Sequence, residues 1–149
     1  MKNLFNKEVY EEIIQRLNAF TASADRQWGK MEAAQMLAHC KAAFSVPLSE
    51  KKLPRSFIGL TVGWLFKHSL YNDKPWRKNL PTAPAFRITD HRNFEKEKKE
   101  LTMLVDRFYT LGPGKVGLFP HPLFGSYTSD QWGQAMYKHL DHHLRQFGV

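Results

Sequence analysis

Apolar residues recur every three to four positions along most of this chain, and this spacing constrains its fold more than any other feature. Near the N-terminus, for example, Val9, Ile13 and Leu17 form one apolar stripe. Such a stripe is typical of an amphipathic α-helix with one face in the core. The segments with this spacing, each predicted to be a long helix, are residues 7–20, 28–44, 90–111 and 128–147.

Residues that commonly begin or end helices bound these segments. Thr128, with Gln131 three positions later, is a capping-box pattern, and Gly112 followed by a proline ends the preceding segment. Residues 56–72 are apolar almost all round, which predicts a shorter, buried extra helix. Three prolines within residues 73–88 exclude a regular helix there and predict a long connection, a kind of segment that often carries function.

The length of the chain and the number of predicted helices together indicate the fold class. A chain of 149 residues has the size of one domain, so we expect a single domain over residues 1–149. Four long amphipathic helices and one shorter helix predict an all-α fold, a helical bundle. The inner faces of such bundles are the usual place for metals and ligands.

Cysteine usage and hydropathy bear on the compartment. Cys40 is the single cysteine, so any metal must be held mainly by histidine or carboxylate. Charged residues interrupt the N-terminal segment, unlike a signal peptide, and the most apolar run, residues 57–66, is half the length needed to cross a bilayer. We therefore expect a soluble cytoplasmic protein with no membrane partner, in which the apolar run around Trp64 suggests a homodimer contact.

The formal net charge of +8 indicates an affinity for anions. Basic residues gather within residues 51–55 and 67–78, whereas those of residues 96–99 alternate with glutamates, as on a solvated helix face. No helix-turn-helix, zinc-finger or RNP-like pattern accompanies them in the sequence, so nucleic-acid binding is not indicated. An acidic small-molecule substrate fits this charge better.

Three of the seven histidines lie in the stretch KHLDHHLRQF, residues 138–147. At about 100° per residue, the apolar side chains of this helix span an arc of roughly 80°. His143 lies about 20° and His139 about 60° outside this arc, whereas His142 lies about 120° away. His139 and His143 are one turn apart and can converge on a single ion. The spacing alone is weak evidence, because seven histidines often produce such a pair by chance.

A third histidine adds weight to the metal interpretation. His39 borders the apolar face of the second predicted helix and can project into the bundle. Three neutral histidines leave a coordination position open, as in catalytic or exchangeable sites. For His39 taken alone, a hydrogen-bonded core histidine is the commoner case.

The stretch QMLAH in the second predicted helix, the loop HPLFG at residues 121–125 and the terminal HLDHHLRQF together resemble the DinB-like (YfiT-like) superfamily of metal-dependent proteins. The resemblance covers essentially the whole chain and is to a branch with an HPxFG loop. It implies a four-helix bundle with up-down-down-up topology. It also implies a metal held by one histidine of the second helix and an HxxxH pair of the last. By motif match these ligands are His39, His139 and His143.

The resemblance also implies a reaction class. Relatives include thiol S-transferases and a thiol-dependent isomerase that use low-molecular-weight thiols, so we expect a small-molecule substrate and a metal-dependent transferase or hydrolase. A divalent metal ion with an open position can acidify a bound thiol or water. Nitrogen ligands suit several ions, of which we favour zinc or nickel over iron, manganese or copper.

His121 and His142 are the candidate catalytic proton carriers, because an imidazole titrates near neutral pH. His121 lies between two prolines, where packing or a turn is the commoner role, and His142 with Gln146 can equally support a ligand or lie at the surface. We expect Trp132 to be the tryptophan beside the metal. Cys40 should pack in the core and not join the site.

Two functions of different class remain open from the sequence. In the first, the three histidines hold a divalent ion for enzymatic thiol transfer or hydrolysis. In the second, the bundle is a non-catalytic metal- or anion-binding sensor or stress-response module that uses the basic loops between residues 51 and 78. Only the first predicts that alanine at His139 abolishes turnover while barely changing the fold.

Overall fold

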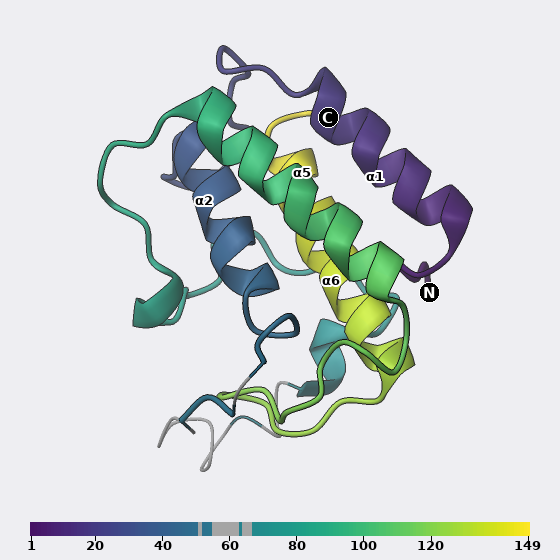
Figure 1. The fold of residues 1–149 in the computed structure, drawn as a ribbon. Coiled ribbons are helices and arrows are strands. Elements are labelled where there is room, and N and C mark those ends of the chain that lie inside the picture. The colour runs from purple at the N-terminus through teal and green to yellow at the C-terminus, as the bar shows by residue number, and fades with distance from the viewer. Residues whose placement is uncertain (51, 55–62, 64–66) are drawn as a thin grey trace.

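The structure is a computed structural model that describes residues 1–50, 52–54, 63 and 67–149 (Figure 1). Four α-helices lie wholly within these residues, namely α1 (Lys7–Ala19), α2 (Ala33–Phe44), α5 (Phe94–Leu111) and α6 (Ser129–Gln146). Two short 3₁₀ helices, η1 (His68–Leu70) and η2 (Pro84–Phe86), lie between α2 and α5. The only β-type pairing in these parts of the chain is an isolated bridge between His121 and Gly125. The predicted all-α fold is confirmed.

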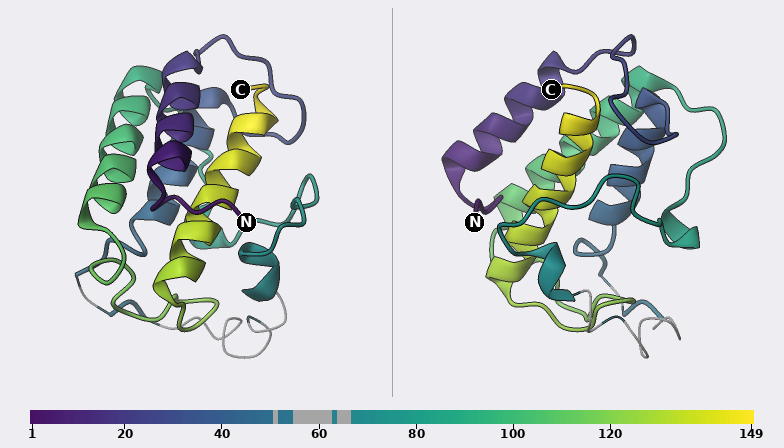
Figure 2. Two further views of the ribbon diagram at one scale, coloured as in Figure 1. Left: turned by 90° about the vertical axis from the view of Figure 1, so that its right-hand side faces the viewer. Right: turned by 180° about the vertical axis from the view of Figure 1, so that it is seen from behind.

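The four α-helices pack around one hydrophobic core (Figures 1 and 2). α1 and α2 each contact both α5 and α6, and η1 lies against α6. Because α2 lies beside α6, side chains of the second and last helices can meet, although they are about 100 residues apart in the sequence. The connection that carries η1 and η2 borders the same region, since η2 contacts α2.

The side chains in the core are those that the helical periodicity directs inward. On α6 these are Met136, Leu140 and Leu144, one turn apart. Burying a large apolar side chain of this kind stabilises a fold by about 1.5–3 kcal/mol, so such stripes largely decide how helices pack. The largest fully buried side chains are Leu4, Ile13, Leu17, Phe20, Met36, Leu37, Phe44, Leu101, Val105, Phe108, Leu140 and Leu144.

Capping side chains set the ends of the helices. The predicted capping box of α6 is confirmed, because Thr128 Oγ1 accepts from the Gln131 backbone N–H at 3.2 Å and the Gln131 side chain accepts in return. α2 and α5 begin later than the sequence predicts. Glu32 forms a second capping box with Gln35, and the side chain of Asn93 accepts from the first turn of α5. Each cap satisfies backbone donors that the helix itself cannot pair.

The most apolar segment, residues 57–66, lies almost entirely outside the described residues. Three predictions therefore stay predictions: the buried helix over residues 56–72, the homodimer contact around Trp64, and the anion-binding role of the basic residues at 51 and 55. Near the end of the predicted helix, the structure shows the short helix η1. Among the described helices, none is long and apolar enough to cross a membrane.

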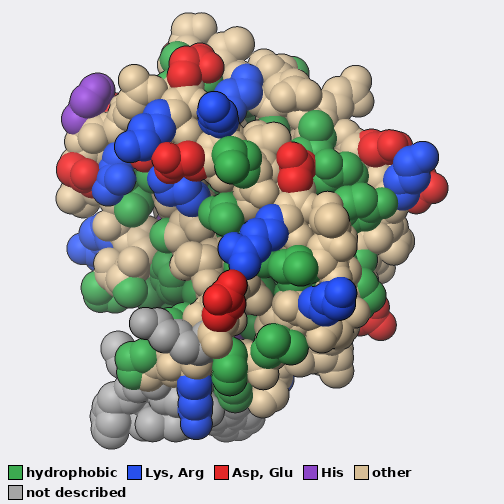
Figure 3. Space-filling model, viewed as in Figure 1, with side chains coloured by type: hydrophobic (Ala, Val, Ile, Leu, Met, Phe, Trp, Pro, Cys, Tyr) green, Lys and Arg blue, Asp and Glu red, His purple; other side chains and the backbone are tan. Residues whose placement is uncertain are grey.

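Charged side chains of both signs are mixed over the face on which α5 lies (Figure 3). The solvated face predicted for residues 96–99 is interrupted at Glu97. This side chain is only 3% exposed, and it pairs with Lys41 of α2 and with Arg92. Lys98 donates to the backbone oxygens of Asn18 and Phe20 at 2.9 and 2.8 Å. Lys98 thus satisfies carbonyl groups at the C-terminal end of α1.

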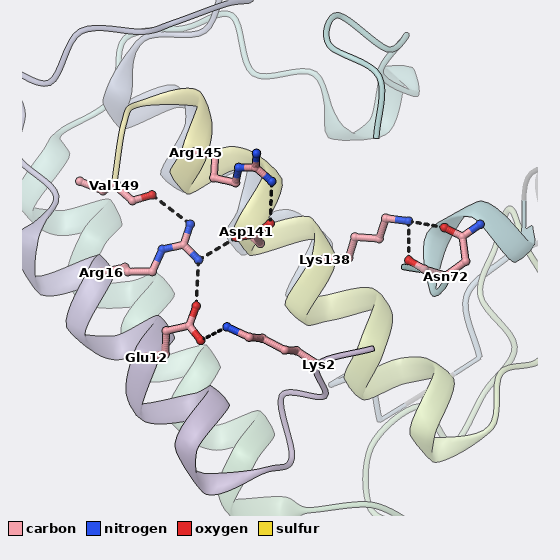
Figure 4. Close-up of polar contacts among 8 residues, drawn as sticks. All are labelled: Lys2, Glu12, Arg16, Asn72, Lys138, Asp141, Arg145 and Val149. Carbon is pink, nitrogen blue, oxygen red and sulfur yellow. Dashed lines mark hydrogen bonds and ion pairs between the residues drawn. The ribbon is translucent and has the colours of Figure 1, made fainter. Parts of the chain in front are cut away.

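An arginine of α1 ties that helix to α6 (Figure 4). Arg16 Nη1 lies 2.8 Å from the carboxylate of Asp141, and Nη2 donates to the backbone oxygen of Val149 at 2.9 Å. Asp141 lies between His139 and His143 in the sequence but faces α1. This contact therefore holds α6 in the rotation that directs the two histidines away from α1, toward α2.

Candidate metal centre

Three histidines from two helices converge inside the bundle. His39 of α2 and His139 and His143 of α6 each present one ring nitrogen, and these three atoms lie within 4.8 Å of one another. The Nε2 atoms of His39 and His139 are 2.9 Å apart, and the ring centroids of His139 and His143 are 4.8 Å apart. The structure thus brings together all three residues that the sequence predicts as metal ligands.

Hydrogen bonds fix the rings of two of these histidines. Nδ1 of His39 lies 2.8 Å from the backbone oxygen of Phe86 in η2, and Nδ1 of His143 lies 2.9 Å from Oε1 of Gln146. Nε2 of Gln146 donates to the backbone oxygen of Trp28 at 2.8 Å, which fixes the orientation of the amide. Since a carbonyl oxygen only accepts, both Nδ1 atoms carry the hydrogen, and each Nε2 keeps its lone pair for a ligand.

Burial keeps all three rings neutral. It lowers the pKa of His39 and lowers that of His139 well below the usual value, with the neighbouring histidines adding to the effect at His139. Burial, with a smaller contribution from His39, lowers the pKa of His143 to about 3. A neutral imidazole is the form that binds a metal, so no proton has to leave these rings at neutral pH.

The donor set fits a divalent transition metal. It consists of three neutral nitrogens, two of them oriented by carbonyl groups, which is the arrangement that proteins use to direct histidine ligands. In the metal-free protein, the short contact between His39 and His139 is a hydrogen bond in which the Nε2–H of His139 donates to His39. If a cation were bound by all three rings, His139 would carry its hydrogen on Nδ1, which would free the Nε2 lone pair, and three histidine ligands would leave a coordination position for a further ligand.

Comparison with known protein families identifies the chain. A family model described as "Protein of unknown function (DUF1569)" matches residues 4–148. The chain belongs to the DUF1569 family. The match includes all three converging histidines, whereas no curated protein and no solved structure matches the chain significantly. These comparisons do not test the resemblance to the DinB-like superfamily, which stays a prediction.

His121 of the DUF1569 protein lies in the loop before α6, away from the three histidines. Its Nδ1 accepts from the backbone N–H groups of Leu123 and Phe124 at 3.0 and 3.3 Å, and its ring centroid lies 5.8 Å from that of Trp132. Trp132 precedes His139 by seven residues, or about 10 Å along a helix. The structure thus shows a packing role for His121, and its proposed role as a proton carrier stays a prediction.

Acid should destabilise the metal-free protein partly through His121. Burial lowers the pKa of His121 from 6.5 to about 4, so between these values the unfolded chain binds a proton that the folded chain does not. The contribution of His121 to the free energy of unfolding is therefore fully present above pH 6.5 and is lost as pH falls toward 4. Between pH 7 and pH 5, the loss of unfolding free energy from this residue is about 2 kcal/mol.

The variant His121→Asn isolates this contribution, because its amide oxygen can accept from the same backbone N–H groups but does not titrate. Urea unfolding in the presence of a chelator should show a smaller loss of unfolding free energy between pH 7 and pH 5 for this variant than for the wild type. Equal losses in the two proteins would show that His121 is not buried in its neutral form.

His142 borders the three-histidine centre from outside. Its ring centroid lies 5.1 Å from that of His143, 5.4 Å from Trp76 and 5.6 Å from Trp28. It also lines a cavity of about 130 Å³ together with both tryptophans. Burial lowers the pKa of His142, so its ring is neutral at physiological pH and can accept a proton. The position of His142 is compatible with the predicted catalytic role, which stays a prediction.

The tryptophan beside the centre is not the one that the sequence predicts. Trp132 packs on His121 and Tyr127, whereas the ring centroid of Trp76 lies 5.7 Å from that of His139. Trp76 comes from the proline-rich connection, where no periodicity indicates which side chains turn inward. The expectation for Cys40 is confirmed, because its thiol is fully buried in the core and burial raises its pKa.

Sequence reasoning missed one part of the centre and identified another only in part. Phe86 contributes only its backbone oxygen, and a carbonyl group carries no side-chain signal. The sequence suggests that Gln146, together with His142, can support a ligand, and the structure shows that Gln146 binds His143, three residues away on the same helix. That spacing is a signal that could have identified it, because residues three apart are neighbours on a helix surface.

Proposed function

We propose that this DUF1569 protein binds one divalent metal ion through His39, His139 and His143 and acts as a metal-dependent transferase or hydrolase. The observation that carries the proposal is the convergence of three ring nitrogens, two of which are left unprotonated by hydrogen bonds to carbonyl groups. Zinc and nickel suit this donor set best, ahead of iron or manganese. The substrate is a small molecule, with a low-molecular-weight thiol or water as the activated group.

The metal and the protein contribute differently to this chemistry. A divalent ion with an open position supplies the lowered pKa of a thiol or water molecule. The residues of the chain orient the ligand rings and shield the centre. Phe86 and Gln146 hold two of these rings by hydrogen bonds, and Trp76 covers His139. His142 is the candidate proton acceptor, because it lies beside His143 and lines the adjacent cavity.

The proposal includes a fold family and a compartment. We assign the DinB-like up-down-down-up bundle, supported by one histidine on the second long helix, an HxxxH pair on the last and the mutual packing of four helices. We assign the cytoplasm because a single, buried thiol suits a reducing compartment.

Metal content tests the proposal directly. Protein purified without a histidine tag, and incubated with zinc or nickel and then desalted, should hold close to one metal ion per chain by plasma mass spectrometry. His39→Ala and His143→Ala should each hold less than about a tenth of that amount, because a three-ligand site rarely tolerates the loss of a ligand.

His91→Ala is the matched control, since His91 is exposed and is not part of the converging set. A wild-type protein that stays empty after incubation, or equal metal in all four proteins, would refute the metal site. Stoichiometric metal without thiol transfer or hydrolysis in a substrate screen would instead support the non-catalytic metal-binding module.

A further inference from the structure

A cavity of about 130 Å³ lies beside the three-histidine centre. The ring of His142 and the indole rings of Trp28 and Trp76 form part of its wall. Trp76 contacts His139, and His142 contacts His143, with ring centroids 5.7 and 5.1 Å apart. A molecule in the cavity is therefore separated from the candidate ligands by a single aromatic ring.

The charged side chains of the cavity wall are mainly positive. The wall contains three cationic side chains, Lys78, Lys138 and Arg145, and one carboxylate, that of Asp141. Three positive charges and one negative charge give the wall a net charge of +2. Asp141 is already engaged by Arg16 of α1 at 2.8 Å and by Arg145 at 3.7 Å (Figure 4). The carboxylate is thus shared with a cation outside the cavity, and the wall keeps an excess of positive charge.

Lys138 is the most unusual of these cations, because it is only 6% exposed. Its ammonium group donates to the backbone oxygen of Ser69 at 2.6 Å. It also donates to the backbone oxygen and Oδ1 of Asn72, at 2.9 and 2.8 Å (Figure 4). These oxygens are neutral. The carboxylate of Asp73 acts on Lys138 but makes no ion pair with it among the described residues, and it pairs with the N-terminal amino group at 3.1 Å. A buried charge that is hydrogen-bonded but not neutralised favours an anion nearby.

Lys78 and Arg145 are placed to contact such an anion directly. Lys78 is exposed, and its Nζ lies 4.6 Å from the ring centroid of Trp28. It has no ion-pair partner in the part of the chain that the structure describes. Arg145 is seven residues from Lys138, two turns along α6, so both project from the same face of that helix (Figure 4).

The size of the cavity and its indole walls narrow the class of ligand. At about 130 Å³, the cavity has room for a carboxylate with a short carbon chain. The two indole rings in the wall suit apolar carbon better than a fully polar anion. We propose that this cavity binds the carboxylate end of a small organic acid, through Lys78 and Arg145 and the field of Lys138.

One consequence of this inference, that the substrate of the metal centre is an organic acid, rests on the proposed function. The binding itself does not need the metal. It can therefore be tested on metal-free protein, so that failure of the cavity and failure of the metal site are seen separately.

The test is a set of nuclear magnetic resonance titrations of chelator-treated protein with propionate, propionamide, propylammonium and inorganic phosphate. Propionate should shift the indole N–H signals of Trp28 and Trp76 and bind roughly ten-fold more tightly than the neutral amide, as a charge-assisted hydrogen bond implies. Lys78→Gln should weaken propionate binding by roughly five-fold, whereas Lys99→Gln, on the exposed face of α5, should leave it unchanged.

Several results would overturn the inference. Equal affinity for propionate and propionamide would remove the charge preference, and equal effects of Lys78→Gln and Lys99→Gln would remove the site. Tighter binding of phosphate than of propionate would assign the cavity to a phosphate group and refute the organic acid. Lys78-dependent propionate binding in a protein that fails to bind zinc and nickel would support the cavity and refute only the metal proposal.

Discussion

Zinc or nickel at one thousand times its dissociation constant is expected to raise the thermal unfolding midpoint of this DUF1569 protein by roughly 10 °C. The reason is mass action, because an ion that binds only the folded chain at this excess stabilises it by about 4 kcal/mol. For a domain of this size, each kcal/mol corresponds to about 2–4 °C. Differential scanning calorimetry of chelator-treated protein, with and without added metal, measures the shift.

The histidine variants show whether this stabilisation comes from the proposed centre. His143→Ala should lose nearly all of the shift, whereas His91→Ala should keep it, because His91 is exposed and outside the cluster. A shift that persists in His143→Ala would mean that the ions bind elsewhere on the chain. That outcome would contradict the three-histidine site even if the wild type contains metal.

Replacing Gln146 with methionine is expected to weaken metal binding by about 10–100-fold, although Gln146 is not a ligand. The amide of Gln146 joins Nδ1 of His143 to the backbone oxygen of Trp28, and methionine has a similar shape but cannot make either hydrogen bond. The ring of His143 then loses its fixed tautomer and orientation. Competition with a chromophoric chelator measures the dissociation constant.

Gln146→Glu separates this positioning role from a general loss of stability. The carboxylate still accepts from Nδ1 of His143 but cannot donate to Trp28, so metal affinity should largely recover while thermal stability stays lower. Gln146 is only 3% exposed, so both variants should unfold at a lower temperature than the wild type. Equal metal affinity in all three proteins would show that Gln146 serves only the fold.

The sequence predicts the helices well because their signal is local. Met136, Leu140 and Leu144 lie one turn apart, and this spacing reveals the buried face of α6 without any knowledge of its neighbours. The starts of α2 and α5 were predicted too early, because Glu32 and Asn93 are themselves the caps. Periodicity does not distinguish a cap from the first residue of a helix.

The candidate site was predictable in part for the same reason. His139 and His143 share a helix face, so their proximity follows from the rise and twist of the helix alone. Trp76 and Phe86 come from the irregular connection between η1 and α5, where no repeating geometry relates one side chain to the next. Their positions beside His139 and His39 are therefore visible only in the structure.

The helices, their apolar faces and the histidine pair of α6 can be read from local sequence, because backbone hydrogen bonding and side-chain spacing act between residues a few positions apart. The meeting of His39 with this pair, the orientation of the rings by Phe86 and Gln146, and the excess of positive charge in the wall of the adjacent cavity depend on how the helices and the connection pack. His39 and His139 are 100 residues apart, and their contact exists because α2 packs beside α6. Such long-range packing depends on how all the apolar faces fit together, which no single segment encodes.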